Sequence, residues 1–135
     1  MVKITMINPK DLHHPVGPYS QVSEVTAPSR FIYLAGQTAS DMHGNTVGVN
    51  DVEAQCAQVF ANVEAGLRAA GASWGNVIHF TNYLISHDDL PAFVKYRNQH
   101  FPTWFPNGAP PNTLLFIEKL LRKEFRVEVQ AIAAI

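Results

Sequence analysis

The clearest repeat of apolar residues lies in the middle of the chain and predicts a helix over residues 51–70. Apolar side chains recur there at intervals of three and four positions, which places them on one face of a helix. They are Cys56, Val59, Phe60, Val63 and Leu67. Asn50 or Asp51 can cap the start of this helix, and Gly71 can end it.

A second helix is predicted over residues 88–100. Asp88-Asp89 can cap its start, and Pro91 stands in its first turn, where proline is tolerated. Its apolar positions are Phe93, Tyr96 and Phe101. The proline-rich stretch that follows, residues 102–111, is predicted to be a loop.

The remaining apolar segments are short and have strand composition. They are residues 2–8, 19–27, 31–36, 77–86, 113–120 and 125–133. The second and third are separated only by the turn Ala27-Pro28-Ser29-Arg30, which predicts an antiparallel hairpin. The order βββαβαββ predicts an α+β fold in which two helices cover one face of a sheet of about six strands.

Residues 113–117 do not alternate between apolar and polar side chains. A strand with one face in water should alternate, so its second face also needs a cover. The two helices can shield only one face of the sheet. We therefore expect another copy of the chain to cover the second face, with a covering loop as the alternative.

Composition places the chain among folded proteins without strong charge. It has 135 residues, 47% of them apolar, and a formal net charge of −1. We expect a single domain over residues 1–135. The ten Lys and Arg residues are scattered, so neither nucleic acid nor a membrane surface is an expected partner. One cysteine and no signal-peptide pattern indicate a cytoplasmic protein.

Common catalytic and cofactor motifs are absent. The chain has no GxGxxG, P-loop, HExxH or CxxC pattern, and its six histidines lack ligand-like spacing. We therefore expect neither a metal nor a cofactor. Cys56 lies on the apolar face of the predicted helix, which favours a core residue over a nucleophile.

Three short stretches place functional groups beside turns or strand ends. They are GPYSQ at 17–21, LAGQ at 34–37 and VEVQ at 127–130. The first presents the Tyr19 hydroxyl, the second ends a strand with Gly36, and the third sets Glu128 between apolar neighbours. A glycine at a strand end lets a ligand approach the backbone closely.

Together and in this order, these stretches resemble the Rid family (reactive intermediate deaminases, also called the YjgF family). LAGQ resembles the family's SGQ, with Ala35 in place of serine, and VEVQAIA at 127–133 resembles its VEIEAIA. The long helix of the family is matched by Gln55, Asn62, Leu67 and Ala70-Gly71, and its following strand by VIHFTNYLIS at 77–86. The resemblance covers nearly the whole chain.

The resemblance implies a chorismate-mutase-like fold and a homotrimer whose ligand clefts lie between subunits. Deaminating members hydrolyse enamines and imines to ketones and ammonia. In those members an arginine at a strand start, in the context Pro-Ala-Arg, binds the substrate carboxylate. Here the chain reads Pro110-Pro111-Asn112 or, shifted by one residue, Pro111-Asn112-Thr113, and neither reading supplies arginine. The resemblance therefore carries over the fold and the cleft more directly than the reaction.

Two functions remain open. The first is a hydrolytic deaminase of small enamines or imines other than the usual 2-imino acids. The second is a trimer that binds small carbonyl or carboxylate metabolites without turnover; the family's association with translation inhibition has little support from the near-neutral charge. The family's asparagine-tyrosine pair in the second helix is also missing, and counting without gaps places Val94 and Arg97 there. Arg97 is a candidate replacement for the missing cation. The candidate catalytic residues are Tyr19 and Glu128, and the candidate substrate-binding residues are Gly36, Asn112, Thr113, Leu114 and Arg97.

Overall fold

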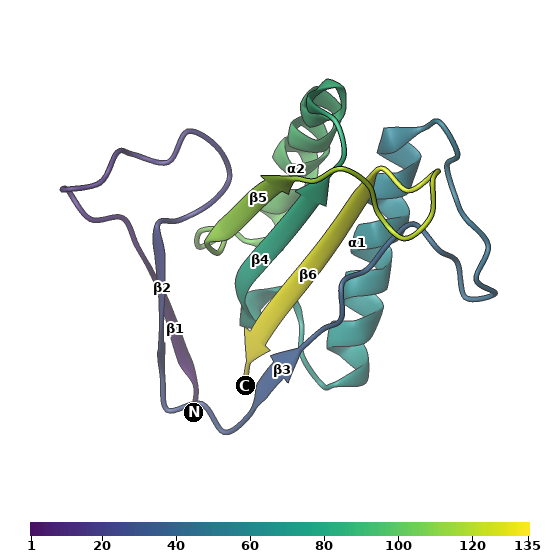
Figure 1. Ribbon diagram of the computed structural model, residues 1–135. Coiled ribbons are helices and arrows are strands. Elements are labelled where there is room, and N and C mark those ends of the chain that lie inside the picture. Colours follow the sequence, from purple (N-terminus) through teal and green to yellow (C-terminus); the bar gives the residue numbers. More distant parts are fainter.

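The computed structural model describes all 135 residues and shows two helices on one face of a four-stranded sheet (Figure 1). The sheet has the strand order β3-β6-β4-β5. Its strands are β3 (Phe31–Tyr33), β4 (Val77–Leu84), β5 (Asn112–Phe116) and β6 (Val127–Ala134). Strand β4 pairs parallel with β5, and β6 pairs antiparallel with both β3 and β4. The predicted α+β class, with helices on one face of a mixed sheet, is confirmed.

The first two strands form a separate sheet. Strand β1 (Lys3–Ile7) pairs antiparallel with β2 (Val22–Thr26), and both stand apart from the main sheet in Figure 1. We call residues 1–26 the arm. The six expected strands are thus divided between two sheets. The predicted hairpin of residues 19–27 with 31–36 is wrong, because β2 pairs with β1 and β3 pairs with β6.

Helix α1 (Val52–Ala69) agrees closely with its prediction. The Asp51 side chain accepts a hydrogen bond from the Ala54 N–H at 3.0 Å, and Gly71 follows with a φ of +80°. Gln55 is fully buried on this helix. Its side-chain amide donates to the Gly48 and Glu124 carbonyls and accepts from the Arg126 N–H, so α1 is joined to the loop before it and to the segment that leads into β6.

Helix α2 (Leu90–Trp104) differs from its prediction at both ends. It runs four residues beyond position 100 and includes Pro102, which had been expected in a loop. The Trp104 ring stacks on Trp74 with centroids 4.3 Å apart, and this contact helps to offset the backbone hydrogen bond that proline cannot donate. Two short 3₁₀ turns, Trp74–Asn76 and His87–Asp89, precede β4 and α2.

The predicted cap Asp88-Asp89 is replaced by another arrangement. The Ser86 hydroxyl accepts from the Asp88 N–H at 3.1 Å, and the Asp89 side chain makes no capping hydrogen bond. Asp89 instead turns inward and accepts two hydrogen bonds from Arg126, at 2.8 and 3.0 Å. This bidentate pair connects the start of α2 to the start of β6.

The core lies between the helices and the sheet. It contains the apolar face of α1, including Cys56, the aromatic residues of α2, and Phe80 of β4 with the aromatic residues of the adjoining turns. Cys56 is 0% exposed, and burial raises the pKa of its thiol to about 12. This position confirms Cys56 as a core residue, because a thiol that stays protonated is a poor nucleophile.

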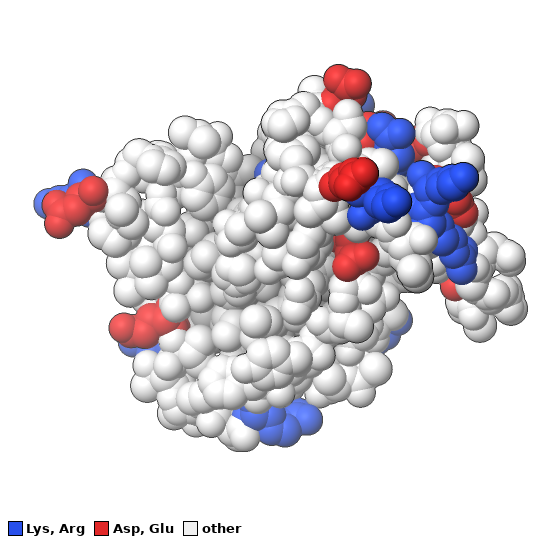
Figure 2. Space-filling view, in the orientation of Figure 1, with Lys and Arg blue, Asp and Glu red and all other residues white.

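The opposite face of the main sheet carries no layer of its own. In β5 the side chains of Thr113 and Leu115 point to this face and are exposed, whereas Leu114 packs against the core. Figure 2 shows this side of the molecule: the surface over β4, β5 and β6 is almost free of charge, and charged groups gather at its rim. We call this surface the free face. No helix in the structure has the length and apolar character needed to cross a membrane.

Candidate functional site

Glu128 and Gly36 lie side by side at the edge of the free face. The segment after β3 continues along β6, because the N–H groups of Gln37 and Val129 each donate to the other residue's carbonyl, at 2.8 and 3.0 Å. A Cβ atom at Gly36 would overlap the Glu128 carboxylate. Glycine is therefore required at position 36 if this carboxylate is to keep its place beside the backbone.

The neighbours of Glu128 on the free face are uncharged. Glu128 pairs with Tyr83 across β4, and one step along the strands Gln130 pairs with Thr81. Among all residues of β3, β4, β5 and β6, Glu128 is the only aspartate, glutamate, lysine or arginine. Sequence reasoning did not single out Tyr83, Thr81 or Gln130. Side chains alternate between the two faces of a strand. Once the pairing of β4 with β6 is known, this alternation places all three residues on the same face as Glu128.

The environment of Glu128 favours its protonated form. Burial raises the pKa of the Glu128 carboxyl above its usual value, since the partly covered site disfavours a charge. No salt bridge or side-chain hydrogen bond of Glu128 stabilises the charged form. A carboxyl group with a raised pKa can donate and accept protons closer to neutral pH than an ordinary glutamate.

Asn112 and Arg97 lie on the other side of the sheet. Asn112 pairs with Phe80, a core residue, so its side chain points toward the helices. Its Oδ1 accepts from the Asn82 Nδ2 at 3.1 Å and from an Arg97 guanidinium nitrogen at 3.4 Å. Arg97 is 7% exposed, and its guanidinium lies 4.6 Å from the centre of the Phe93 ring. These residues form a polar cluster beneath β4 and β5, with the sheet between them and Glu128.

The alternative alignment places Thr113 on the free face. Thr113 pairs with Thr81 and points the same way as Glu128, whereas Leu114 faces the core. Two strand spacings separate Thr113 from Gln130, and Glu128 lies two residues away from Gln130 along β6, so Thr113 and Glu128 are roughly 12 Å apart within one chain.

Tyr19 is not part of this group in a single chain. It lies in the loop that joins β1 to β2, where its N–H donates to the Gly17 carbonyl at 2.9 Å. In Figure 1 this loop lies beyond β5, on the far side of the sheet from the segment that follows β3. The structure thus brings together Gly36 and Glu128, places Thr113 on the same face, and leaves Tyr19 on the arm.

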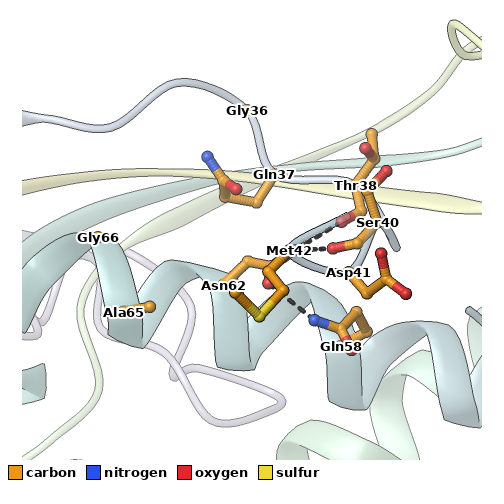
Figure 3. A pocket seen from close by; sticks show the side chains of 10 residues that line it. All are labelled: Gly36, Gln37, Thr38, Ser40, Asp41, Met42, Gln58, Asn62, Ala65 and Gly66. Carbon is orange, nitrogen blue, oxygen red and sulfur yellow. Dashed lines mark hydrogen bonds between the residues drawn. The ribbon is translucent and has the colours of Figure 1, made fainter. Parts of the chain in front are cut away.

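A polar groove lies on the other side of the Gly36 segment, between this segment and α1 (Figure 3). It has a volume of about 660 Å³. Asn62 of α1 spans it, donating to the Thr38 and Ser40 carbonyls at 3.0 and 2.8 Å, and accepts from Gln58 at 2.8 Å. These hydrogen bonds hold the loop after Gly36 against α1. They therefore help to fix the position of Gly36.

Comparison with known proteins places this arrangement in a family. The family model described as Endoribonuclease L-PSP matches residues 10–135. A RutC family protein from Pyrococcus abyssi is 34% identical over 88% of this chain and 87% of that protein. The chain belongs to the Rid family. A 2-iminobutanoate/2-iminopropanoate deaminase from Capra hircus is 32% identical over 87% of this chain and 80% of its own length, so the Rid relatives of this chain include deaminases.

A crystal structure of a Rid-family protein from Yersinia pestis superposes with a TM-score of 0.84, at 28% identity and 98% coverage of both chains. The match extends over nearly the whole chain, so it includes most of the first 30 residues.

Proposed function

We propose that this protein hydrolyses small imines or enamines that lack a carboxylate, in clefts between the subunits of a homotrimer. The observation that carries the proposal is the position of Glu128, a lone carboxyl of raised pKa beside Gly36 on an otherwise uncharged face. The kinship with 2-iminobutanoate/2-iminopropanoate deaminases supports the reaction class.

The chemistry requires one group that moves protons. Water adds to the carbon of the protonated imine and gives a proton to the Glu128 carboxylate, which yields a neutral carbinolamine. Glu128 then returns this proton to the nitrogen of the carbinolamine. The C–N bond breaks while the carbinolamine hydroxyl gives its proton to the Glu128 carboxylate, and the products are a ketone or aldehyde and ammonia. An enamine first takes a proton at carbon from protonated Glu128 and becomes the protonated imine. The missing side chain at Gly36 leaves the space that the Glu128 carboxylate occupies beside the backbone.

The charge distribution favours substrates without a carboxylate. Arg97, the candidate replacement cation, is buried under the sheet with Asn112. On the free face, the strands supply no lysine or arginine that could pair with an anion. A protonated imine carries a positive charge, which the Glu128 carboxylate attracts, whereas a 2-imino acid would bring a second anion beside it.

The free face supports the proposed assembly. It is uncharged apart from Glu128 and exposes Leu115, 42% of whose surface is accessible in the single chain. An apolar sheet face of this kind is typical of a contact between subunits. Three copies that turn their free faces inward would cover it and form clefts at their boundaries, as the family resemblance implies.

The test uses two kinds of imine, each generated in place by an oxidase. An amine oxidase supplies neutral imines, and an amino-acid oxidase supplies 2-imino acids. We expect the wild-type protein to accelerate loss of the neutral imines, and Glu128→Gln to lower this rate by roughly 10²–10⁴-fold, the usual contribution of a general acid–base. Glu64→Gln is the matched control, because Glu64 is exposed on α1, away from the free face. Saturable imine binding without turnover would instead support a binding protein.

A further inference from the structure

The arm makes no backbone hydrogen bond to the main sheet. Strands β1 and β2 pair only with each other, which leaves the outer edge of β2 without a partner. One hydrogen bond joins the arm to the rest of the chain, from the Ser23 hydroxyl to the Ile78 carbonyl at 2.7 Å. Strand β2 therefore has a complete set of unpaired donors and acceptors along one side.

The main sheet has a matching unpaired edge at β3. This strand pairs with β6 on one side and with nothing on the other. Phe31 and Tyr33 on it are 52% and 72% exposed. Unpaired, apolar edge strands readily accept a strand from another chain, and folded proteins rarely leave them open.

A short hinge separates the two edges. The N–H groups of Ser29 and Arg30 donate to the Ile135 carbonyl, at 2.6 and 3.0 Å, so this end of the linker is fixed to the main sheet. Only Ala27 and Pro28 lie between this fixed end and the arm. Ala27 has a φ of +53°, in a region that residues with a side chain seldom occupy. The backbone is thus strained at the point where the arm leaves the main sheet.

We propose that β2 of one copy pairs antiparallel with the β3 edge of a second copy, so that the arms are exchanged around the assembly. The linker has the length of a hairpin turn, and the same register can form between two chains. With Thr26 opposite Phe31, this register sets Glu24 opposite Tyr33 and Gln21 opposite Gly36. In a closed ring of copies, the β3 edge of each copy is paired with β2 of a neighbouring copy, so no β3 edge stays unpaired. The open arm of this chain is the conformation that such an exchange requires.

The exchange also completes the candidate site. Because Gln21 comes to lie opposite Gly36, Tyr19 of one copy lies beside the Gly36–Thr38 segment of the other, next to that copy's Glu128. This second part rests on the proposed function; the pairing itself does not. A site that needs Tyr19 from one chain and Glu128 from another exists only in the assembly.

Cysteine cross-linking between two different chains tests the pairing directly. One chain carries Glu24→Cys and a longer tag, the other carries Tyr33→Cys, and the two are co-expressed. Residues directly opposite in antiparallel strands are close enough for a disulfide. Both positions are exposed, and the native Cys56 is fully buried, so only the new thiols should react. We expect a covalent heterodimer on a non-reducing gel after mild oxidation.

Lys3→Cys mixed with Tyr33→Cys is the matched control. Lys3 is exposed on β1, one strand further from the partner, and should give no heterodimer. A chain with both Glu24→Cys and Tyr33→Cys shows whether the hairpin closes on itself. Cross-linking only within that chain would overturn the proposal, and so would the absence of any cross-link.

Mixed oligomers of two defective variants separate the pairing from the function. In co-assemblies of Tyr19→Phe with Glu128→Gln, some sites combine an intact Tyr19 from one chain with an intact Glu128 from the other. We expect imine hydrolysis above the level of either variant alone. If the cross-linked heterodimer forms and wild type is active, but the mixed oligomers recover no activity, the shared site is refuted and the strand exchange stands. If the heterodimer forms but wild type is inactive, only the proposed function is refuted.

Discussion

The two alignments place the missing arginine either at Asn112, on the helix-covered face of the sheet, or at Thr113, on the free face. Two arginine variants can therefore test which face binds the ligand. Thr113→Arg adds a guanidinium to the free face, where a substrate carboxylate would lie. A hydrogen bond from a charged donor contributes roughly 1.5–3 kcal/mol, against about 0.5–1.5 for a neutral donor. The gain of about 1–2 kcal/mol corresponds to roughly 5- to 30-fold in kcat/KM for a 2-imino acid.

Asn112→Arg has a different expected result. Its side chain would enter the cluster where Asn112 now accepts hydrogen bonds from Asn82 and Arg97. A second guanidinium beside the buried Arg97 has no anion to pair with. We expect a loss of stability on the order of 3 kcal/mol, and a fall in Tm of roughly 10 °C, without a gain in activity on 2-imino acids.

The assay compares kcat/KM on 2-iminopropanoate with kcat/KM on a neutral imine, for wild type and both variants, alongside thermal melts. The ratio of the two substrates is the decisive quantity, because it removes effects of folding and active-enzyme concentration. An unchanged ratio in Thr113→Arg would show that position 113 does not face the ligand. A raised ratio in a stable Asn112→Arg protein would refute the assignment of the faces.

Three further predictions concern stability and assembly. Because the folded-state pKa of Glu128 is raised, the stability linked to its protonation is present below the ordinary pKa of glutamate and is lost as pH rises through the raised value. Glu128→Gln should therefore melt at or above wild type at pH 8; a clearly lower Tm there would contradict this. Leu115→Glu puts a carboxylate on the free face and should lower the mass found by light scattering on dilution, with circular dichroism unchanged; a mass equal to wild type at every concentration would exclude this face as the contact. Asp89→Asn removes the charge from the pair with Arg126, whose side chain is 32% exposed, and should cost about 1–3 kcal/mol in chemical denaturation; no change in midpoint would show that the pair contributes little.

Local sequence determined most of the elements and the outline of the candidate site. Apolar residues at helical spacing, together with Asp51 and Gly71, located α1 because these signals act between residues close in the chain. Gly36 and Glu128 could be selected for a similar reason. A glycine at a strand end and a carboxylate between apolar neighbours are each recognised from a short stretch of sequence. Their contact across β6 is consistent with that choice of residues.

Pairing between distant segments was decided only by the tertiary structure. Side chains alternate along a strand, so a shift of one residue moves a side chain to the other face, and the sequence alone cannot choose between Asn112 and Thr113. The register of β5 on β4 makes that choice. The same limit applies to the arm: a four-residue linker allows β2 to fold onto β3 or away from it, because the competing contacts come from residues far along the chain or from another copy. Local pattern fixes the period of each strand, and only the assembled sheet fixes its partner.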